Sequence, residues 1–208
     1  MNLHDNIKEF FKNNLPQTNE QLLQLCINDI VNHYAEPHRF YHNQNHIAKM
    51  MESVTKHPNG NKPHQILETI FHDVIYNPKS NTNEEDSLDF MKTWLNKLYT
   101  NPQHIWPDSN WNEGILATKT HKSNNKDIQV VIDADLEILS EPWETYEIYA
   151  QAIREEYNHV PDEEFFQGRT HFLKKLLEQN IYLTQTYKQK ETIAKQNILR
   201  EIKQNETN

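Results

Sequence analysis

Apolar residues recur every three or four positions along almost the whole 208-residue chain, which is the spacing of one face of an α-helix. Glycine occurs only 3 times. β-Sandwiches, barrels and phosphate-binding glycine loops use glycine for positive φ angles or close backbone approach, so this composition argues against all of them. We therefore expect an all-α fold built as a single domain over residues 1–208.

Proline, glycine and capping residues divide this pattern into helices. Two capping boxes are expected, from Thr18 to Gln21 and from Thr82 to Glu85. The β-branched stretch 130–132 could form a strand, but its flanks keep the helical spacing, so we assign it to a helix. A polar loop is expected around Pro102 and Pro107. The expected helices lie near 3–11, 18–36, 47–57, 63–76, 82–98, 109–121, 126–139, from Pro142, from Pro161 and after Ile181.

The net charge of -9 and the lack of a basic run argue against a nucleic-acid partner. Cys26 is the only cysteine, so an internal disulfide is impossible, as is usual in a reducing cytoplasm. The N-terminal residues contain no apolar signal core, and no long apolar run follows. We expect a soluble, cytoplasmic protein with no membrane partner.

Two histidine clusters could support chemistry. His42 and His46 are four residues apart and share a helix face if their helix begins early enough, although this spacing alone favours two partly exposed histidines. The pair His72-Asp73 follows the apolar stretch 66–71, on what we expect to be the same helix. A charged pair on the inner side of a helix needs a partner, because burying unpaired charge is costly.

Two further candidates lie downstream. Asp133 and Asp135 occupy an apolar segment, and we expect one of them to be exposed at the helix edge. His121 is flanked by Lys119 and Lys122. This segment is either an exposed basic helix end, which suits the helix dipole, or a site that contacts phosphate or a second metal ion.

Taken in order, a His, a His-Asp pair and an Asp on separate helices resemble the HD-domain superfamily of metal-dependent phosphohydrolases, over residues 39–139. The stretch 41–46, Y-H-N-x-x-H, and the A-D-L at 134–136 are similar to motifs of cyclic-nucleotide phosphodiesterases. The wider pattern looks closest to a bacterial family of predicted HD phosphohydrolases and includes Tyr76, 83–87, 154–161 and Gly168-Arg169. The resemblance implies a helical HD bundle with core 39–139 and additional C-terminal helices over 140–208.

The same resemblance implies a metal site and a reaction. Attack of a metal-bound water would hydrolyse a small phosphorylated metabolite or a nucleotide. Mixed imidazole and carboxylate ligands suit Mn²⁺, Fe²⁺, Ni²⁺, Co²⁺, Zn²⁺ or Mg²⁺, and the sequence does not choose among them. The phosphodiesterase segments that recognise a purine have no counterpart here, so a cyclic nucleotide is not implied. The implied metal ligands are His46, His72, Asp73 and Asp135.

Further roles follow by resemblance. His42 matches the acid that protonates the leaving oxygen, and Asp73 would also orient the water. Glu84 either anchors a water near the site or stabilises a helix start. The candidates for positive charge near the phosphate are Lys119, His121 and Lys122, with Arg39 a weaker one. Arg154, Tyr157, His159 and Arg169 lie outside the core motif, and we interpret them mainly as a structural polar network, with a substrate role left open.

Three other interpretations remain. A di-iron HD oxygenase needs two more histidines between the His-Asp pair and the last Asp, and that stretch offers His104 and His121, of which His104 lies in a Pro-flanked loop. A non-catalytic metal- or nucleotide-binding regulator would keep the ligands without turnover. A plain helical structural protein would have to explain why four potential ligands occur in HD order.

Overall fold

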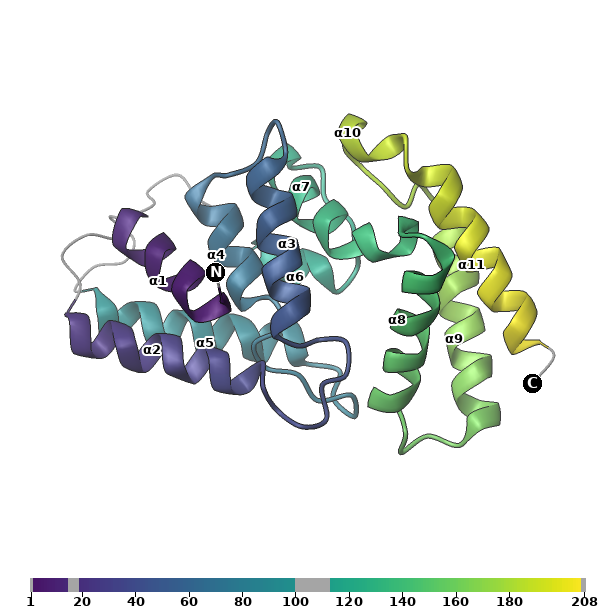
Figure 1. Cartoon of the computed structure of the whole chain (residues 1–208), viewed down its shortest axis with the longest axis horizontal. Helices are drawn as coiled ribbons and strands as arrows, with labels where there is room; N and C mark the ends of the chain where they lie inside the picture. The colour runs from purple at the N-terminus through teal and green to yellow at the C-terminus, as the bar shows by residue number, and fades with distance from the viewer. Residues whose placement is uncertain (1, 15–18, 100–112, 207–208) are drawn as a thin grey trace.

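A computed structural model of the chain describes residues 2–14, 19–99 and 113–206, and every regular element within these ranges is a helix (Figure 1). This confirms the predicted all-α class. None of these helices combines the length and apolar character needed to cross a membrane. The helices are α1 (Leu3–Asn14), α2 (Glu20–His33), α3 (Gln44–Lys56), α4 (Pro63–Phe71), α5 (Asn83–Leu98), α6 (Glu113–Thr118), α7 (Lys126–Asp135), the 3₁₀ helix η2 (Leu136–Ser140), α8 (Trp143–Glu156), α9 (Asp162–Leu177), α10 (Gln185–Lys188) and α11 (Glu191–Asn205).

Two clusters of buried apolar side chains organise these helices. The first is built mainly by α1 to α5, on the left of Figure 1, and the second mainly by η2, α8, α9 and α11, on the right. Helix α7 contributes to both, because Val130 and Val131 belong to the first cluster while Ile128 and Ile132 belong to the second. The stretch 130–132 lies within α7 and is helical, as predicted. Because α7 packs into both clusters, it joins the two halves.

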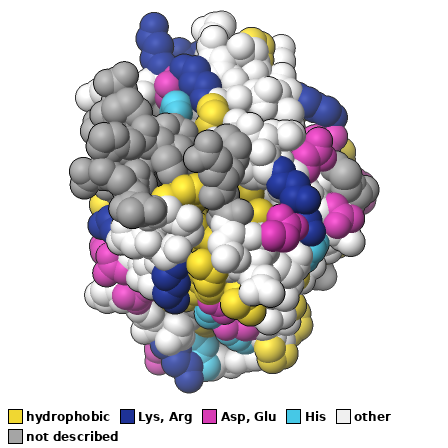
Figure 2. Space-filling view, turned by 90° about the vertical axis from the view of Figure 1, so that its left-hand side faces the viewer, with side chains coloured by type: hydrophobic (Ala, Val, Ile, Leu, Met, Phe, Trp, Pro, Cys, Tyr) yellow, Lys and Arg dark blue, Asp and Glu magenta, His cyan; other side chains and the backbone are white. Residues whose placement is uncertain are grey.

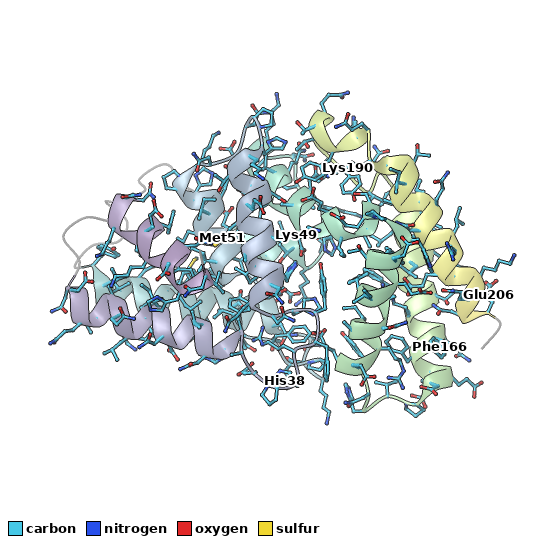
Figure 3. The ribbon with its side chains drawn as sticks, viewed as in Figure 1. His38, Lys49, Met51, Phe166, Lys190 and Glu206 are labelled. Carbon is cyan, nitrogen blue, oxygen red and sulfur yellow. The ribbon has the colours of Figure 1, made fainter. Side chains whose placement is uncertain are left out.

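Polar contacts between α3 and the C-terminal half reinforce this junction. Lys49 of α3, labelled in Figure 3, pairs with Glu141 at 2.6 Å. Glu137 of η2 accepts hydrogen bonds from Ser53 of α3 and from Lys190, which lies just before α11. On the face shown in Figure 2, basic and acidic side chains are interspersed, with no single basic patch among the residues that are coloured.

Helix α4 is the most enclosed element, since all its residues from Gln65 to Phe71 are buried. Pro63 occupies its first turn, as predicted. The helix ends at Phe71, several residues earlier than expected. Tertiary contacts account for this, because Tyr34 donates to the carbonyl of Ile70 and Arg39 donates to the carbonyls that follow the helix. His72 and Asp73 therefore lie on the turn after α4 and not within a helix.

Local capping also differs from the expectation. Helix α3 begins at Gln44 after the N-cap Asn43, so His42 precedes it and shares no helix face with His46. The capping box at Thr82 is wrong, because the Thr82 hydroxyl donates to Asp86 and makes no cap hydrogen bond.

Elsewhere, Thr18 and the loop with Pro102 and Pro107 lie outside the described residues, as does the start of the helix expected at 109–121. Helix α2 is capped by Asn19. The helix expected at 126–139 is divided in the structure: the α-helix α7 ends at Asp135, and the 3₁₀ helix η2 follows it.

One carboxyl group is buried inside the first half. Glu68 of α4 is 0% exposed, and neither of its carboxyl oxygens has a hydrogen-bond partner among the described residues. Gly114 closes the space above it, and a Cβ at Gly114 would lie 2.1 Å from the Glu68 Cδ. Burial raises the pKa of Glu68 well above its usual value, and the charges of Asp127 and Glu113 act in the same direction.

This burial predicts a specific dependence of stability on pH. Because the folded-state pKa of Glu68 is raised, its contribution to stability is complete below the unfolded-state pKa and is lost as the pH rises through the folded-state value. The substitution Glu68→Gln removes the titration, so the variant should lose less stability than the wild type between pH 5 and pH 8. Urea unfolding at both pH values measures the free energy of unfolding of the wild type, of Glu68→Gln and of the exposed control Glu9→Gln. An equal change in this free energy between the two pH values in all three proteins would contradict the prediction.

Candidate metal centre

Three separate chain segments bring two imidazoles and two carboxylates together. His46 lies in the first turn of α3, His72 and Asp73 on the turn after α4, and Asp135 at the end of α7. The Nε2 atoms of His46 and His72 are 3.4 Å apart, and Asp73 Oδ2 lies 3.0 Å from the latter. The Oδ1 of Asp135 lies 3.3 Å from His46 Nε2 and 3.7 Å from His72 Nε2. The structure thus places all four predicted ligands around one point.

The spacing suits a transition-metal ion. One ligand atom from each of His46, His72 and Asp73 lies within 4.8 Å of the other two. Metal–nitrogen bonds are about 2.0–2.1 Å long, so a cation fits between two nitrogens that are 3.4 Å apart. Asp135 lies outside this tightest group but approaches both imidazoles. The mixture of nitrogen and oxygen ligands fits Zn²⁺, Fe²⁺, Mn²⁺, Co²⁺ or Ni²⁺.

The backbone around the site fixes the ligand orientation. Because a carbonyl can only accept, His72 Nδ1 donates to the carbonyl of Thr69 at 2.9 Å, so Nε2 is the nitrogen that faces the other ligands and would bind a cation in place of its proton. The guanidinium of Arg39 donates to the carbonyls of Asp73 at 2.6 Å and His42 at 3.1 Å. Its side chain is 0% exposed and also pairs with Glu36. Arg39 is therefore a positioning residue, which corrects its expected role as a phosphate-binding cation.

The electrostatics of the cluster keep both carboxylates ionised. Burial lowers the pKa of His46. At His72 the opposing effect of burial is outweighed by the adjacent Asp73 carboxylate, which raises the pKa to about 9. Burial would raise the pKa of Asp73 and Asp135, but the surrounding histidines lower both below their usual values. A buried site with two carboxylates favours a cation.

His121 extends this cluster. It follows α6 with a left-handed φ of 52°, and its amide donates to the carbonyl of Ala117 at 2.8 Å. Its Nε2 lies 3.4 Å from Asp135 Oδ2, whereas the other oxygen of Asp135 faces His46. Of the two roles considered for this segment, the structure therefore brings His121 to the ligand set and not to an exposed helix end.

His42 forms a second polar centre beside the ligands. Its Nδ1 lies 2.6 Å from Glu156 Oε2, and the same oxygen accepts from the Tyr76 hydroxyl at 2.9 Å. The other oxygen of Glu156 accepts from the amides of Tyr41 and His42. Burial opposes the charge on each partner, but their hydrogen bond raises the pKa of His42 and lowers that of Glu156.

The sequence interpretation gave Glu156 no role, and the structure shows it to be the residue that orients His42. Its only signal in the sequence is its place in the segment 154–161, which belongs to the motif pattern of the resembling family. Spacing along the chain cannot reveal the contact between Glu156 and His42, because the two residues lie far apart in the sequence.

Other candidates have different partners. Lys119 binds the Glu85 carboxylate at 2.7 Å and lies 3.5 Å from Glu84. These two surface carboxylates compensate its positive charge. Among the described residues, no hydrogen bond or ion pair joins Lys119, Lys122 or Glu84 to the four ligands. Asp133, one of the pair of which we expected one member to be exposed, is buried and accepts from the amides of Leu183 and Thr184.

The C-terminal residues left open form local networks. Arg154 donates to the carbonyls of Tyr157 and Val160 and pairs with Asp162. Arg169 pairs with Glu201 at 2.8 Å and donates to the Tyr149 hydroxyl. His104 lies outside the described residues.

A cavity of about 500 Å³ opens beside the ligand set. His42, His121 and Asp135 line one end of it, and the rest is lined mainly by residues of η2, α8 and α9. Of the four predicted ligands, Asp135 borders this cavity directly.

The cluster predicts a stabilising response to divalent metal. At a free metal concentration about 100-fold above Kd, binding adds about 2.7 kcal/mol, which corresponds to about 5–10 °C in Tm for a chain of this length. We expect this rise for the wild type with Mn²⁺, Co²⁺ or Zn²⁺, reversal by EDTA, and loss of the rise in His72→Gln. The exposed His171→Asn is the control, and an equal rise in His72→Gln would place metal binding elsewhere.

Comparison of the chain with protein-family models, with curated protein sequences and with solved structures gives no match. The features of the chain that bear on its function are the four predicted ligands, His42 with Glu156, His121 and the adjoining cavity.

Proposed function

We propose that the chain is a metal-dependent phosphohydrolase of the HD type that acts on a small phosphate ester or nucleotide. The convergence of His46, His72, Asp73 and Asp135 from three segments carries this proposal. The cavity beside them gives a substrate access to the site. The single cysteine, Cys26, is buried and free, which suits the reducing cytoplasm that we propose as its location.

Each residue has a distinct part in this reaction. A divalent cation supplies a lowered pKa for a water molecule and polarisation of a phosphoryl oxygen. Asp73 and Asp135 would hold this cation together with the imidazoles of His46 and His72. His42 lines the cavity with its Nδ1 engaged by Glu156, so Nε2 remains to give a proton to the leaving oxygen. Phosphate esters need such an acid because an alkoxide leaves poorly.

One observation favours a second candidate. The two oxygens of Asp135 face different histidines, Oδ1 toward His46 and Oδ2 toward His121. His121 and Asp135 Oδ2 would then be available to hold a second cation, which is the observation that favours a di-iron oxygenase. Metal content and spectroscopy separate the two proposals, because a mixed-valent di-iron signal supports the oxygenase.

Substitution of the ligands and of the acid should have different effects. A panel of phosphate monoesters and nucleotides assayed with several divalent metals should reveal turnover by the wild type. Asp73→Asn should lose both the metal-induced rise in Tm and the turnover. His42→Asn should keep the rise in Tm but lower kcat by about 10²- to 10⁴-fold, since general acid catalysis contributes about this much.

The exposed His171→Asn serves as the matched control and should retain full activity. Tight nucleotide binding without turnover of any ester in the panel would contradict the hydrolase and support a regulator. An unchanged kcat in His42→Asn would remove His42 from the reaction.

A further inference from the structure

The cavity beside the ligand set extends well beyond the space that a phosphate group needs. Its volume is about 500 Å³. One end is lined by His42, His121 and Asp135, and the other end is lined mainly by residues of η2, α8 and α9. The two ends are connected through aromatic rings, since Tyr41 lies 4.8 Å from the His46 ring and 4.6 Å from the Tyr149 ring. A phosphate held at the ligands would leave the remaining volume to the rest of its molecule.

The walls of this volume are mostly apolar and aromatic. Helix α8 contributes Tyr149 and Ile153, and helix α9 contributes Phe165 and Phe172. Phe172 is 40% exposed although it is large and apolar. Aromatic walls of this kind bind planar apolar groups, because stacking adds to the hydrophobic effect.

The charges at the far end argue against a second phosphate there. Arg169 is the one cationic side chain in this part of the lining, and its guanidinium is paired with the buried Glu201 and bound to Tyr149. Glu164 adds a negative charge to the same region. A diphosphate or triphosphate directed into the cavity would therefore meet no uncompensated positive charge, whereas an uncharged group would meet no unfavourable charge.

Gly168 keeps the α9 wall open. It lies within the helix Asp162–Leu177, where glycine is less favourable than alanine. It lines the cavity, and a Cβ built on it would meet no atom within 4 Å. Gly168 is exposed at the border of the cavity, so a larger side chain can be added without a clash at its Cβ, and we expect it to narrow the space beside α9.

We propose that this cavity binds the organic group of a phosphate monoester, and that this group is uncharged, apolar and aromatic. The proposal rests on the proposed phosphohydrolase function for the position of the phosphate. Gly168 determines how large an organic group the cavity accepts.

The test compares two esters of primary alcohols, benzyl phosphate and ethyl phosphate, so that the leaving groups differ in size more than in reactivity. The wild type should favour benzyl phosphate by at least about tenfold in kcat/KM, since filling an apolar pocket is worth this much. In Gly168→Leu this preference should disappear, while kcat/KM for ethyl phosphate changes by less than about twofold. Gln167→Leu adds the same side chain at the neighbouring exposed position, outside the cavity lining, and should keep the preference.

Two outcomes separate the cavity from the reaction. Equal kcat/KM for both esters in the wild type, or a preference retained in Gly168→Leu, would overturn the cavity assignment and leave the hydrolase standing. Turnover of neither ester would contradict the proposed function instead. Saturation-transfer NMR with benzyl alcohol then decides the cavity: binding that is lost in Gly168→Leu supports it, and no binding to the wild type overturns it.

Discussion

The site depends on the hydrogen bonds that the buried guanidinium of Arg39 donates to backbone carbonyls. The guanidinium binds the carbonyl of His42 in one segment and those of Asp73 and Val74 in another, so it sets the distance between the acid and the ligand pair. Glu36 compensates its charge. The Arg39 side chain is fully buried whereas that of Glu36 is 32% exposed, so loss of Glu36 would leave a buried charge without its partner. The turn after α4 is therefore held firmly enough to present His72 and Asp73 in one orientation.

Helix α7 explains why the site lies where the two apolar clusters meet. Its residues pack into both clusters, and it ends at Asp135. Asp133 and Asp135 are two positions apart and so point about 160° apart around the helix. One carboxylate binds the amides of Leu183 and Thr184 in the C-terminal half, and the other faces the imidazoles. The same helix thus fixes the C-terminal half and supplies a ligand, which places the cavity between the halves.

The all-helical class could be predicted from the sequence because apolar spacing is a local pattern, and the order of His46, His72, Asp73 and Asp135 pointed to four side chains that the fold brings together. Apolar spacing indicated helix in every segment where the structure has one, including the β-branched stretch in α7, but it did not separate α7 from η2 or α10 from α11. The end of α4 could not be predicted, because Tyr34 and Arg39 act on it from distant segments. Glu156 was missed for the same reason. Lys119 was chosen as a neighbour of His121, but a long side chain can turn away from its sequence neighbours, and it binds Glu85.

His42 and His46 differ in their partners, and this difference separates the proposed acid from the proposed metal ligands. His42 and His46 are close, with ring centroids 6.0 Å apart, yet only His46 faces His72 and Asp135. His42 is held by Glu156, which is anchored by two amides and by Tyr76. A histidine bound in this way by a carboxylate is oriented through Nδ1 and leaves Nε2 for another partner. In the proposed reaction, His42 would therefore serve the leaving oxygen from the cavity while His46 and His72 would hold the cation.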